Sequence, residues 1–197
     1  ADISEFEELR STTEQIEFYD AATSASSAAL RSLEKPLIAM IRGFCVGGGM
    51  AIALAADMRI SADDGQFGVP AAKLGLGYGY GGIKELMNLG GPSYAKEIFF
   101  TARQFDAEEA LQMGLVNRVL PPDELAAYVD EYAATIAGNA PLTVLAAKTV
   151  VREAVKDPDK RDLELCQKVV DDCFASDDYK EGRKAFMEKR KPEFKGR

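Results

Sequence analysis

The first seventy residues alternate between runs that favour helix and runs that favour strand. Residues 12–33, rich in Ala, Glu and Ser, favour a helix. The short apolar run at residues 37–41, directly after Pro36, indicates a buried strand. A turn, a run of strong helix formers and two further β-favouring runs follow at residues 43–49, 50–56, 58–62 and 66–69.

The remainder of the chain reads as a series of helices, at residues 83–89, 93–101, 107–113, 123–137, 141–155, 162–174 and 177–189. Asp106 is expected to cap the start of the third of these helices, and Gly114 its end. The front third is therefore expected to mix strands with helices, and the back half to be entirely helical. We predict an α/β fold with a helical C-terminal part that packs on the core or forms an oligomer interface.

Composition and charge narrow the class of protein. The length of 197 residues suits one domain, or one domain with an appendage, and 47% hydrophobic residues indicate a globular chain. A net charge of −8 disfavours nucleic-acid binding, and the absence of His excludes Ser-His-Asp triads and His-containing zinc sites. Three scattered cysteines indicate reduced thiols in a cytoplasmic protein. The apolar stretch 36–56 is long enough for a membrane span, but Arg42 and the glycine triplet within it predict no membrane partner.

Two glycine-rich loops carry the candidate chemistry. Gly47, Gly48 and Gly49 run into a helix whose free N–H groups suit an anion or a developing oxyanion; the alternative is a tight turn with nothing bound. The second loop, residues 75–82, contains a literal G-x-G-x-x-G, but no apolar strand precedes it, so the match to a dinucleotide fingerprint is weak. Tyr78 and Tyr80 are the loop side chains with a proton to give, or else they pack at its base.

The last eighteen residues form a basic tail in an otherwise acidic protein. Residues 180–197 hold eight Lys or Arg against three Glu, a net charge of +5 that leaves −13 for the rest of the chain. One interpretation is a solvated helix face and tail. The other is a site for the phosphates of a polyanionic small ligand.

Taken together, these residues resemble the crotonase family, also called the enoyl-CoA hydratase/isomerase superfamily. The resemblance runs through the whole chain in order. The matching segments are KPLIA at 35–39, GFCVGGG at 43–49, ADMRI at 56–60, FGVP at 67–70, the glycines Gly75, Gly81 and Gly82, FDA at 105–107 with Ala110, MGLVN at 113–117, EG at 181–182 and AFMEKRKP at 185–192.

The resemblance implies a ClpP/crotonase-like spiral of ββα units, with a helical C-terminal trimerisation region. It also implies an acyl-CoA thioester as ligand, a role in fatty acid metabolism, and a homotrimer or dimer of trimers. No separate cofactor is expected, since coenzyme A is part of the substrate. Residues 1–120 would form the core, with the N-terminal part of the family domain missing, and residues 121–197 a helical region of the same domain.

The family's site residues carry over to positions of this chain. The backbone N–H groups of Ala1 and Gly48 match the two donors that polarise the thioester carbonyl and stabilise an enolate-like anion. Ile3 matches a residue of the adenine pocket, and Phe186 and Lys189 match C-terminal positions that reach the coenzyme. The expected substrate-binding set is completed by Asp2, Gly47, Ala51, Ala71 and Tyr78.

The chain departs from the family at both catalytic glutamates. Ala51 and Ala71 stand where family hydratases have them, and alanine can neither activate water nor protonate carbon. Decarboxylases of malonyl-type CoA thioesters resemble this chain in having a tyrosine at the position of Tyr78. Three hypotheses therefore stay open: an enoyl-CoA hydratase by overall similarity, a decarboxylase or thioesterase that uses Tyr78, and an acyl-CoA-binding homologue without catalysis.

Overall fold

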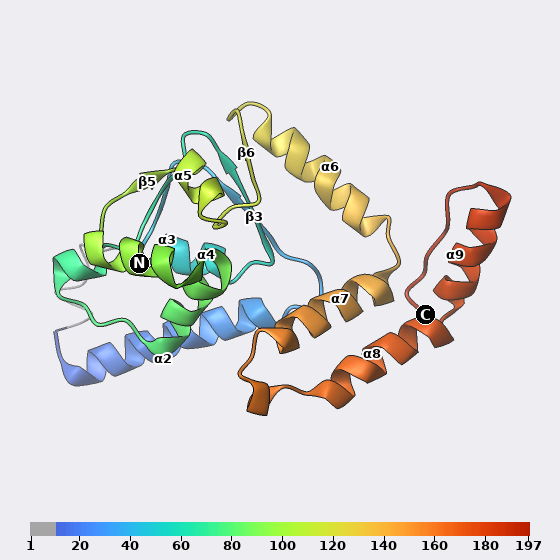
Figure 1. The fold of residues 1–197 in the computed structure, drawn as a ribbon, viewed down its shortest axis with the longest axis horizontal. Helices are drawn as coiled ribbons and strands as arrows, with labels where there is room; N and C mark the ends of the chain where they lie inside the picture. The colour runs from blue at the N-terminus through green and yellow to red at the C-terminus, as the bar shows by residue number, and fades with distance from the viewer. Residues whose placement is uncertain (1–10) are drawn as a thin grey trace. The chain divides into compact units, whose positions relative to one another are not determined.

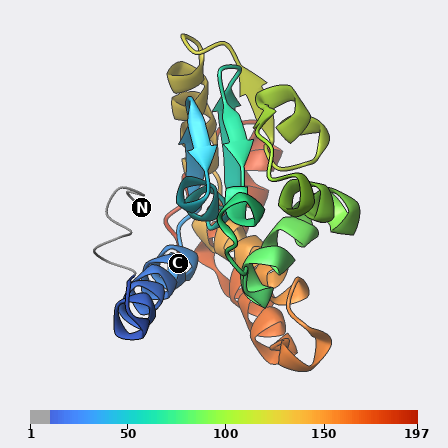
Figure 2. The ribbon, with the colours of Figure 1, turned by 90° about the vertical axis from the view of Figure 1, so that its left-hand side faces the viewer.

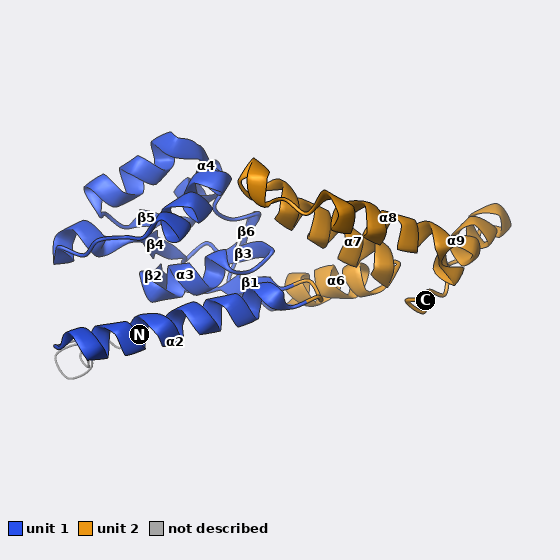
Figure 3. Cartoon of the chain, turned by 90° about the horizontal axis from the view of Figure 1, so that it is seen from below, with its two compact units in different colours: residues 1–33, 37–126 blue, residues 34–36, 127–197 orange. Residues whose placement is uncertain are grey.

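The computed structural model describes residues 11–197 (Figure 1), and the chain divides into two compact units (Figure 3). Unit 1 comprises residues 1–33 and 37–126, and unit 2 comprises residues 34–36 and 127–197. Within the described part of the chain, every strand belongs to unit 1. The predicted division near residue 120, into two parts of one domain, stays a prediction.

Unit 1 is built on two three-stranded sheets. The first has the order β1-β3-β6 and is parallel throughout, from Ile38–Ile41, Met58–Ala62 and Arg118–Leu120 (Figure 2). The second has the order β2-β4-β5, from Phe44–Val46, Gln66–Gly68 and Phe105–Asp106, with β4 parallel to β2 and antiparallel to β5. The chain therefore gives one strand to each sheet and then a helix, twice over, which is the predicted repeat of ββα units.

The helices of unit 1 follow local sequence signals. They are α2 (Thr13–Ser32), α3 (Gly48–Leu54), the 3-10 helix η2 (Pro70–Leu74), α4 (Tyr80–Thr101) and α5 (Ala107–Gln112). Asp106 caps α5 as predicted: its side chain accepts the N–H of Glu109, whose carboxylate accepts the N–H of Asp106. The core between these helices and the sheets is apolar, and its largest members include Met50, Phe67, Leu86, Ile98 and Phe105.

Unit 2 is helical. It contains most of α6 (Leu125–Ala137), then α7 (Pro141–Ala154), the 3-10 helix η3 (Pro158–Lys160), α8 (Leu163–Ala175) and α9 (Asp177–Glu188). Helix α7 packs against α8, and α8 contacts α9. No single helix among residues 11–197 is long and apolar enough to cross a bilayer; the bent pair α6 and α7 passes on length and composition alone.

Three predictions of secondary structure are wrong in detail. Residues 43–49 are not one turn, because Phe44–Val46 pairs with β4 as β2 and α3 already begins at Gly48. The back half is not entirely helical, because β5 and β6 add short strands whose hydrogen-bond partners lie far away in sequence. The helices expected at 83–89 and 93–101 are joined in α4, which breaks at Gly91, where φ is 78°.

Candidate functional site

The turn between β2 and α3 is held in an unusual backbone conformation. Gly47 has φ 55° and ψ −112°, which strains any residue with a side chain. Its N–H donates to the carbonyl of Gly68 at 2.9 Å, and its own carbonyl accepts from Ala51 at 3.0 Å. That bond is the first i to i−4 hydrogen bond of α3. The N–H groups of Gly48 and Gly49, which precede Ala51, therefore have no intrahelical acceptor. Both residues are exposed, and the turn therefore presents two donors to solvent or to a ligand.

The segment that carries the second alanine is fixed to this turn. Gly68 ends β4 beside Gly47, and a Cβ on it would lie 3.0 Å from the carbonyl oxygen of Arg103, so a side chain here would require the Arg103 backbone to move slightly. Three residues later Ala71 is buried in the core at the start of η2, and its carbonyl accepts from Leu76. The hydrogen bond from Gly47 to Gly68 thus joins the two motifs in which the family places its glutamates.

Arg59 supports α3 from its other end. This side chain is 5% exposed, and its guanidinium donates to the carbonyls of Leu115 and Ala56 at 2.7 Å each and to that of Ala53 at 3.4 Å. The cation therefore lies at the C-terminal end of α3, where the helix dipole favours positive charge. The sequence carries no signal for this role, because the acceptors are backbone atoms that only the fold brings together.

Tyr78 packs on α4 just before that helix begins. Its ring lies 4.9 Å from the ring of Phe99, centroid to centroid, and it closely approaches Gly82. Burial raises the pKa of the phenol, and the charge of Glu85 raises it further. The phenol therefore stays protonated at neutral pH. Helix α4 contacts both α3 and η2, so this loop belongs to the same part of unit 1 as the glycine turn.

Two other predictions concern the glycine-rich loop: its match to a dinucleotide fingerprint and the position of Tyr80. The G-x-G-x-x-G of residues 77–82 follows a 3-10 helix and not a strand, so the loop is not a dinucleotide-binding motif. Tyr80 is 70% exposed, and the Lys84 ammonium lies 5.7 Å from its ring centroid.

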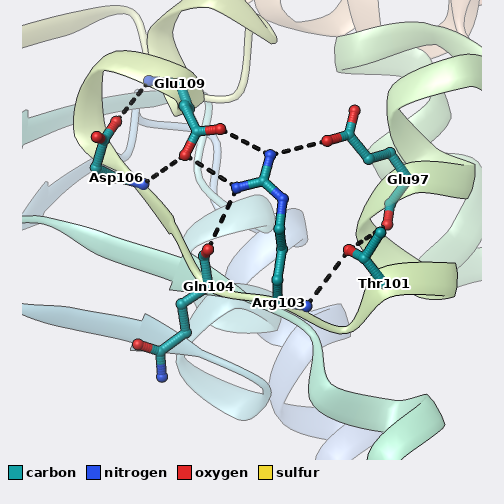
Figure 4. Close-up of polar contacts among 6 residues, drawn as sticks. All are labelled: Glu97, Thr101, Arg103, Gln104, Asp106 and Glu109. Atoms are coloured by element: carbon teal, nitrogen blue, oxygen red, sulfur yellow. Dashed lines mark hydrogen bonds and ion pairs between the residues drawn. The ribbon is translucent and has the colours of Figure 1, made fainter.

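A polar cluster centred on Arg103 lies near the end of α4 (Figure 4). The Arg103 guanidinium donates to both carboxylate oxygens of Glu109, at 2.7 and 3.0 Å, and to Glu97 at 2.8 Å. These bonds tie α4 to the start of α5, on either side of β5. Gly68, in the FGVP segment, lies close to the backbone carbonyl of Arg103.

The C-terminal site residues lie in unit 2. Phe186 is 83% exposed and helps to line an apolar cavity of about 980 Å³ between α7, α8 and α9. Lys189 ends α9 in the left-handed conformation, and its ammonium is exposed, with no ion pair to the residues the structure describes. Part of the basic tail is paired within unit 2, because Arg190 is bound to Glu181 and Glu188.

Of the expected site residues, Gly47, Gly48, Ala51, Ala71 and Tyr78 all lie in unit 1. The remaining members, Ala1, Asp2 and Ile3, lie outside the described residues. The missing carboxylates have no obvious substitute in the buried thiol of Cys45, whose pKa burial raises to about 11.

The sequence model of the family described as enoyl-CoA hydratase/isomerase matches residues 1–197, the whole chain. The chain belongs to this family. It is 39% identical over 198 residues to a short-chain-enoyl-CoA hydratase of Clostridium acetobutylicum, covering 100% of this chain and 75% of the relative. It is 38% identical over 169 residues to a carnitinyl-CoA dehydratase of Citrobacter koseri, covering 84% of this chain and 65% of that protein.

Solved structures agree on the fold. A crystal structure of an enoyl-CoA hydratase/carnitine racemase from Magnetospirillum magneticum matches with a TM-score of 0.90 at 37% identity, over 100% of this chain and 73% of that one. An enoyl-CoA hydratase/isomerase family protein from Hyphomonas neptunium matches with a TM-score of 0.92 at 36% identity, over 100% of this chain and 75% of that one. The predicted crotonase-like fold is therefore confirmed. The chain spans about two thirds to three quarters of the length of these relatives.

Proposed function

We propose that this chain is an acyl-CoA enzyme that stabilises a thioester enolate at the start of α3 and is a poor hydratase. One observation carries the proposal: an intact Gly47–Gly49 turn is joined to the segments in which Ala51 and Ala71 replace both acid/base carboxylates. Donors aimed at a developing oxyanion lower the barrier to any reaction that passes through an enolate. Hydration needs in addition a base for water and an acid for carbon, and neither alanine supplies one.

Decarboxylation of a malonyl-type CoA thioester suits these residues best. The bond from Cα to the carboxylate breaks, its electron pair moves into the thioester carbonyl, and CO2 leaves. The Gly48 N–H, with that of Ala1 as the family's second donor, would hold the enolate oxygen. A proton then reaches Cα. The substrate brings its own leaving group, so this sequence needs no carboxylate base.

Tyr78 is the proposed donor in this sequence. Its raised pKa keeps the phenol protonated at neutral pH, which fits a group that orients a carboxylate or delivers a proton. The same property argues against Tyr78 as a base in thioester hydrolysis, since a base must be deprotonated first. An acyl-CoA-binding homologue without catalysis is the second candidate, and the loss of both carboxylates favours it.

Coenzyme A binding and assembly complete the proposal. The 3′-phosphate and the pyrophosphate of the coenzyme would bind Lys189, and no cofactor beyond the substrate is required.

Assembly as a homotrimer or a dimer of trimers would cover large apolar side chains that unit 2 exposes on α8 and α9, among them Phe174, Phe186 and Met187. Sedimentation at micromolar concentration tests the assembly, and a monodisperse monomer would contradict it.

Two variants of the glycine turn test the enolate site. Gly48→Val places a branched side chain where the thioester carbonyl must approach, and we expect a loss of about 10²–10³-fold in methylmalonyl-CoA decarboxylation. Gly49→Ala is the matched control, because a Cβ there meets nothing within 4 Å. Equal turnover by the two folded variants would remove the oxyanion assignment. Binding of acyl-CoA without turnover of any thioester by the wild type would favour the non-catalytic homologue.

A further inference from the structure

The C-terminal tail folds back and is tied to the first turn of α9. The Asp178 side chain, only 4% exposed, accepts the N–H groups of Lys195 and Gly196 on its two carboxylate oxygens, at 2.7 and 2.8 Å. In return, the N–H groups of Asp177 and Asp178 donate to the carbonyl of Arg197 at 2.8 and 3.3 Å. The end of the chain is therefore fixed by four hydrogen bonds to the start of the helix.

Glu181, one turn further along α9, makes a second tie. Its two oxygens accept from Nη1 and Nη2 of Arg190 at 2.6 and 2.9 Å, a bidentate pair that restricts orientation as well as distance. The N–H of Glu193 donates to the same carboxylate at 2.9 Å. Glu188 accepts from Nε of Arg190 at 2.6 Å. The Arg190 hydrogen bonds lower the pKa of Glu181 to about 2, so this tie is ionised at neutral pH.

Lys189 lies at the turn between α9 and this tail. Its backbone has φ 54° and ψ 39°, a left-handed conformation that is disfavoured for a residue with a side chain. Its N–H donates to the carbonyl of Phe186, and that of Arg190 donates to the carbonyl of Ala185. The ammonium group is thus carried by a disfavoured turn, which is closed on one side by the helix and on the other by the Glu181–Arg190 pair.

We propose that Asp178 and Glu181 are positioning residues for Lys189. By closing the tail onto α9, the two carboxylates hold the Lys189 turn in the conformation that presents its ammonium to the phosphates of coenzyme A. A turn ordered before binding loses less conformational freedom when the ligand arrives, and the affinity rises accordingly. The inference rests on the proposed function, because it takes coenzyme A as the ligand of Lys189.

A pair of adjacent substitutions in the full chain isolates this role. Asp178→Asn leaves a single carbonyl oxygen for two tail N–H groups and turns an NH2 group toward one of them. Asp177→Asn removes the same charge from the same helix turn, but among residues 11–197 the hydrogen bond of that side chain goes to Lys180, at 2.9 Å, and not to a tail N–H. Free coenzyme A, titrated calorimetrically at low salt, is expected to bind Asp178→Asn about tenfold more weakly than wild type, and Asp177→Asn within about twofold of it.

Combination with Lys189→Gln separates positioning from a general structural role. We expect Lys189→Gln alone to weaken coenzyme A binding, and Asp178→Asn to add nothing further in that background, because its effect passes through the lost ammonium. The double variant Asp178→Asn with Glu181→Gln is measured in the same way, so that one remaining tie does not hide the effect. Circular dichroism verifies that each variant is folded.

The outcomes distinguish the positioning role from the proposed function. Full additivity of Asp178→Asn and Lys189→Gln, or unchanged affinity when both ties are removed, would overturn the positioning role while leaving coenzyme A binding intact. Failure of the wild-type chain to bind coenzyme A would overturn the proposed function, and the positioning role with it.

Discussion

The substitution Gly82→Ala should displace the Tyr78 ring while leaving its phenol group chemically unchanged. A Cβ on Gly82 would lie 2.8 Å from Cε1 and 3.1 Å from Cδ1 of the Tyr78 ring, so the ring must shift. The shift weakens the aromatic pair with Phe99, which contributes about 0.5–1.5 kcal/mol. Replacement of a helical glycine by alanine returns up to about 1 kcal/mol, so the free energy of unfolding should change by less than about 1 kcal/mol.

Turnover should respond much more strongly than stability. A displaced proton donor typically reduces the rate of the chemical step, and we expect a loss of roughly 10- to 100-fold in methylmalonyl-CoA decarboxylation by Gly82→Ala. Gly81→Ala is the control, since a Cβ there meets nothing within 4 Å in the same helix turn. If Gly82→Ala, Gly81→Ala and Tyr78→Phe all turn over like the wild type, Tyr78 is a packing residue.

Three further predictions concern the support of the site and the ionisable groups. Arg59→Leu leaves the buried carbonyls of Ala56 and Leu115 without their donor, at a cost of about 1–3 kcal/mol for each group. Urea denaturation should therefore show a free energy of unfolding lower than that of the wild type by roughly 4 kcal/mol, and a decrease below about 1 kcal/mol would contradict this. The pKa of Glu181 is lowered from 4.5 to about 2 in the folded chain, so its stabilisation of the tail is present above pH 4.5 and is lost as the pH falls toward 2. Hydrogen exchange of the Glu193 amide, which donates to the Glu181 carboxylate, should therefore accelerate between pH 5 and pH 2.5 after correction for intrinsic rates, and equal protection at both would refute the assignment. Burial raises the pKa of Cys45 to about 11, so a thiol reagent at pH 8 should label the half-buried Cys166 and Cys173 and leave Cys45 unreacted in the native protein; rapid labelling of all three would contradict its burial.

The elements that could be predicted from the sequence are those specified by local chemistry. The Asp106 capping box and the helices of the back half depend on residues within a turn or two of one another, and they form close to where they were expected. The strands β5 and β6 were missed, because runs of two and three residues carry no periodicity and are strands only through their distant partners.

The candidate site divides in the same way. The glycine turn and the two alanines are visible in the sequence, since each is a residue type in a recognisable motif. The supports of the site are not visible, because they depend on long-range geometry. Arg59 reaches carbonyls on two other segments, Tyr78 meets Phe99, and the tail carboxylates find N–H groups up to eighteen residues away.

The relative rates of hydration and decarboxylation test the central claim most directly. A single preparation of the wild-type chain is assayed with crotonyl-CoA by the loss of enoyl-thioester absorbance, and with methylmalonyl-CoA by the appearance of propionyl-CoA. Each acid or base group normally contributes about 10²–10⁴-fold, and here both carboxylates are absent. We predict measurable decarboxylation with hydration at or near the background rate. Hydration at a rate normal for family hydratases, with no decarboxylation, would contradict the account.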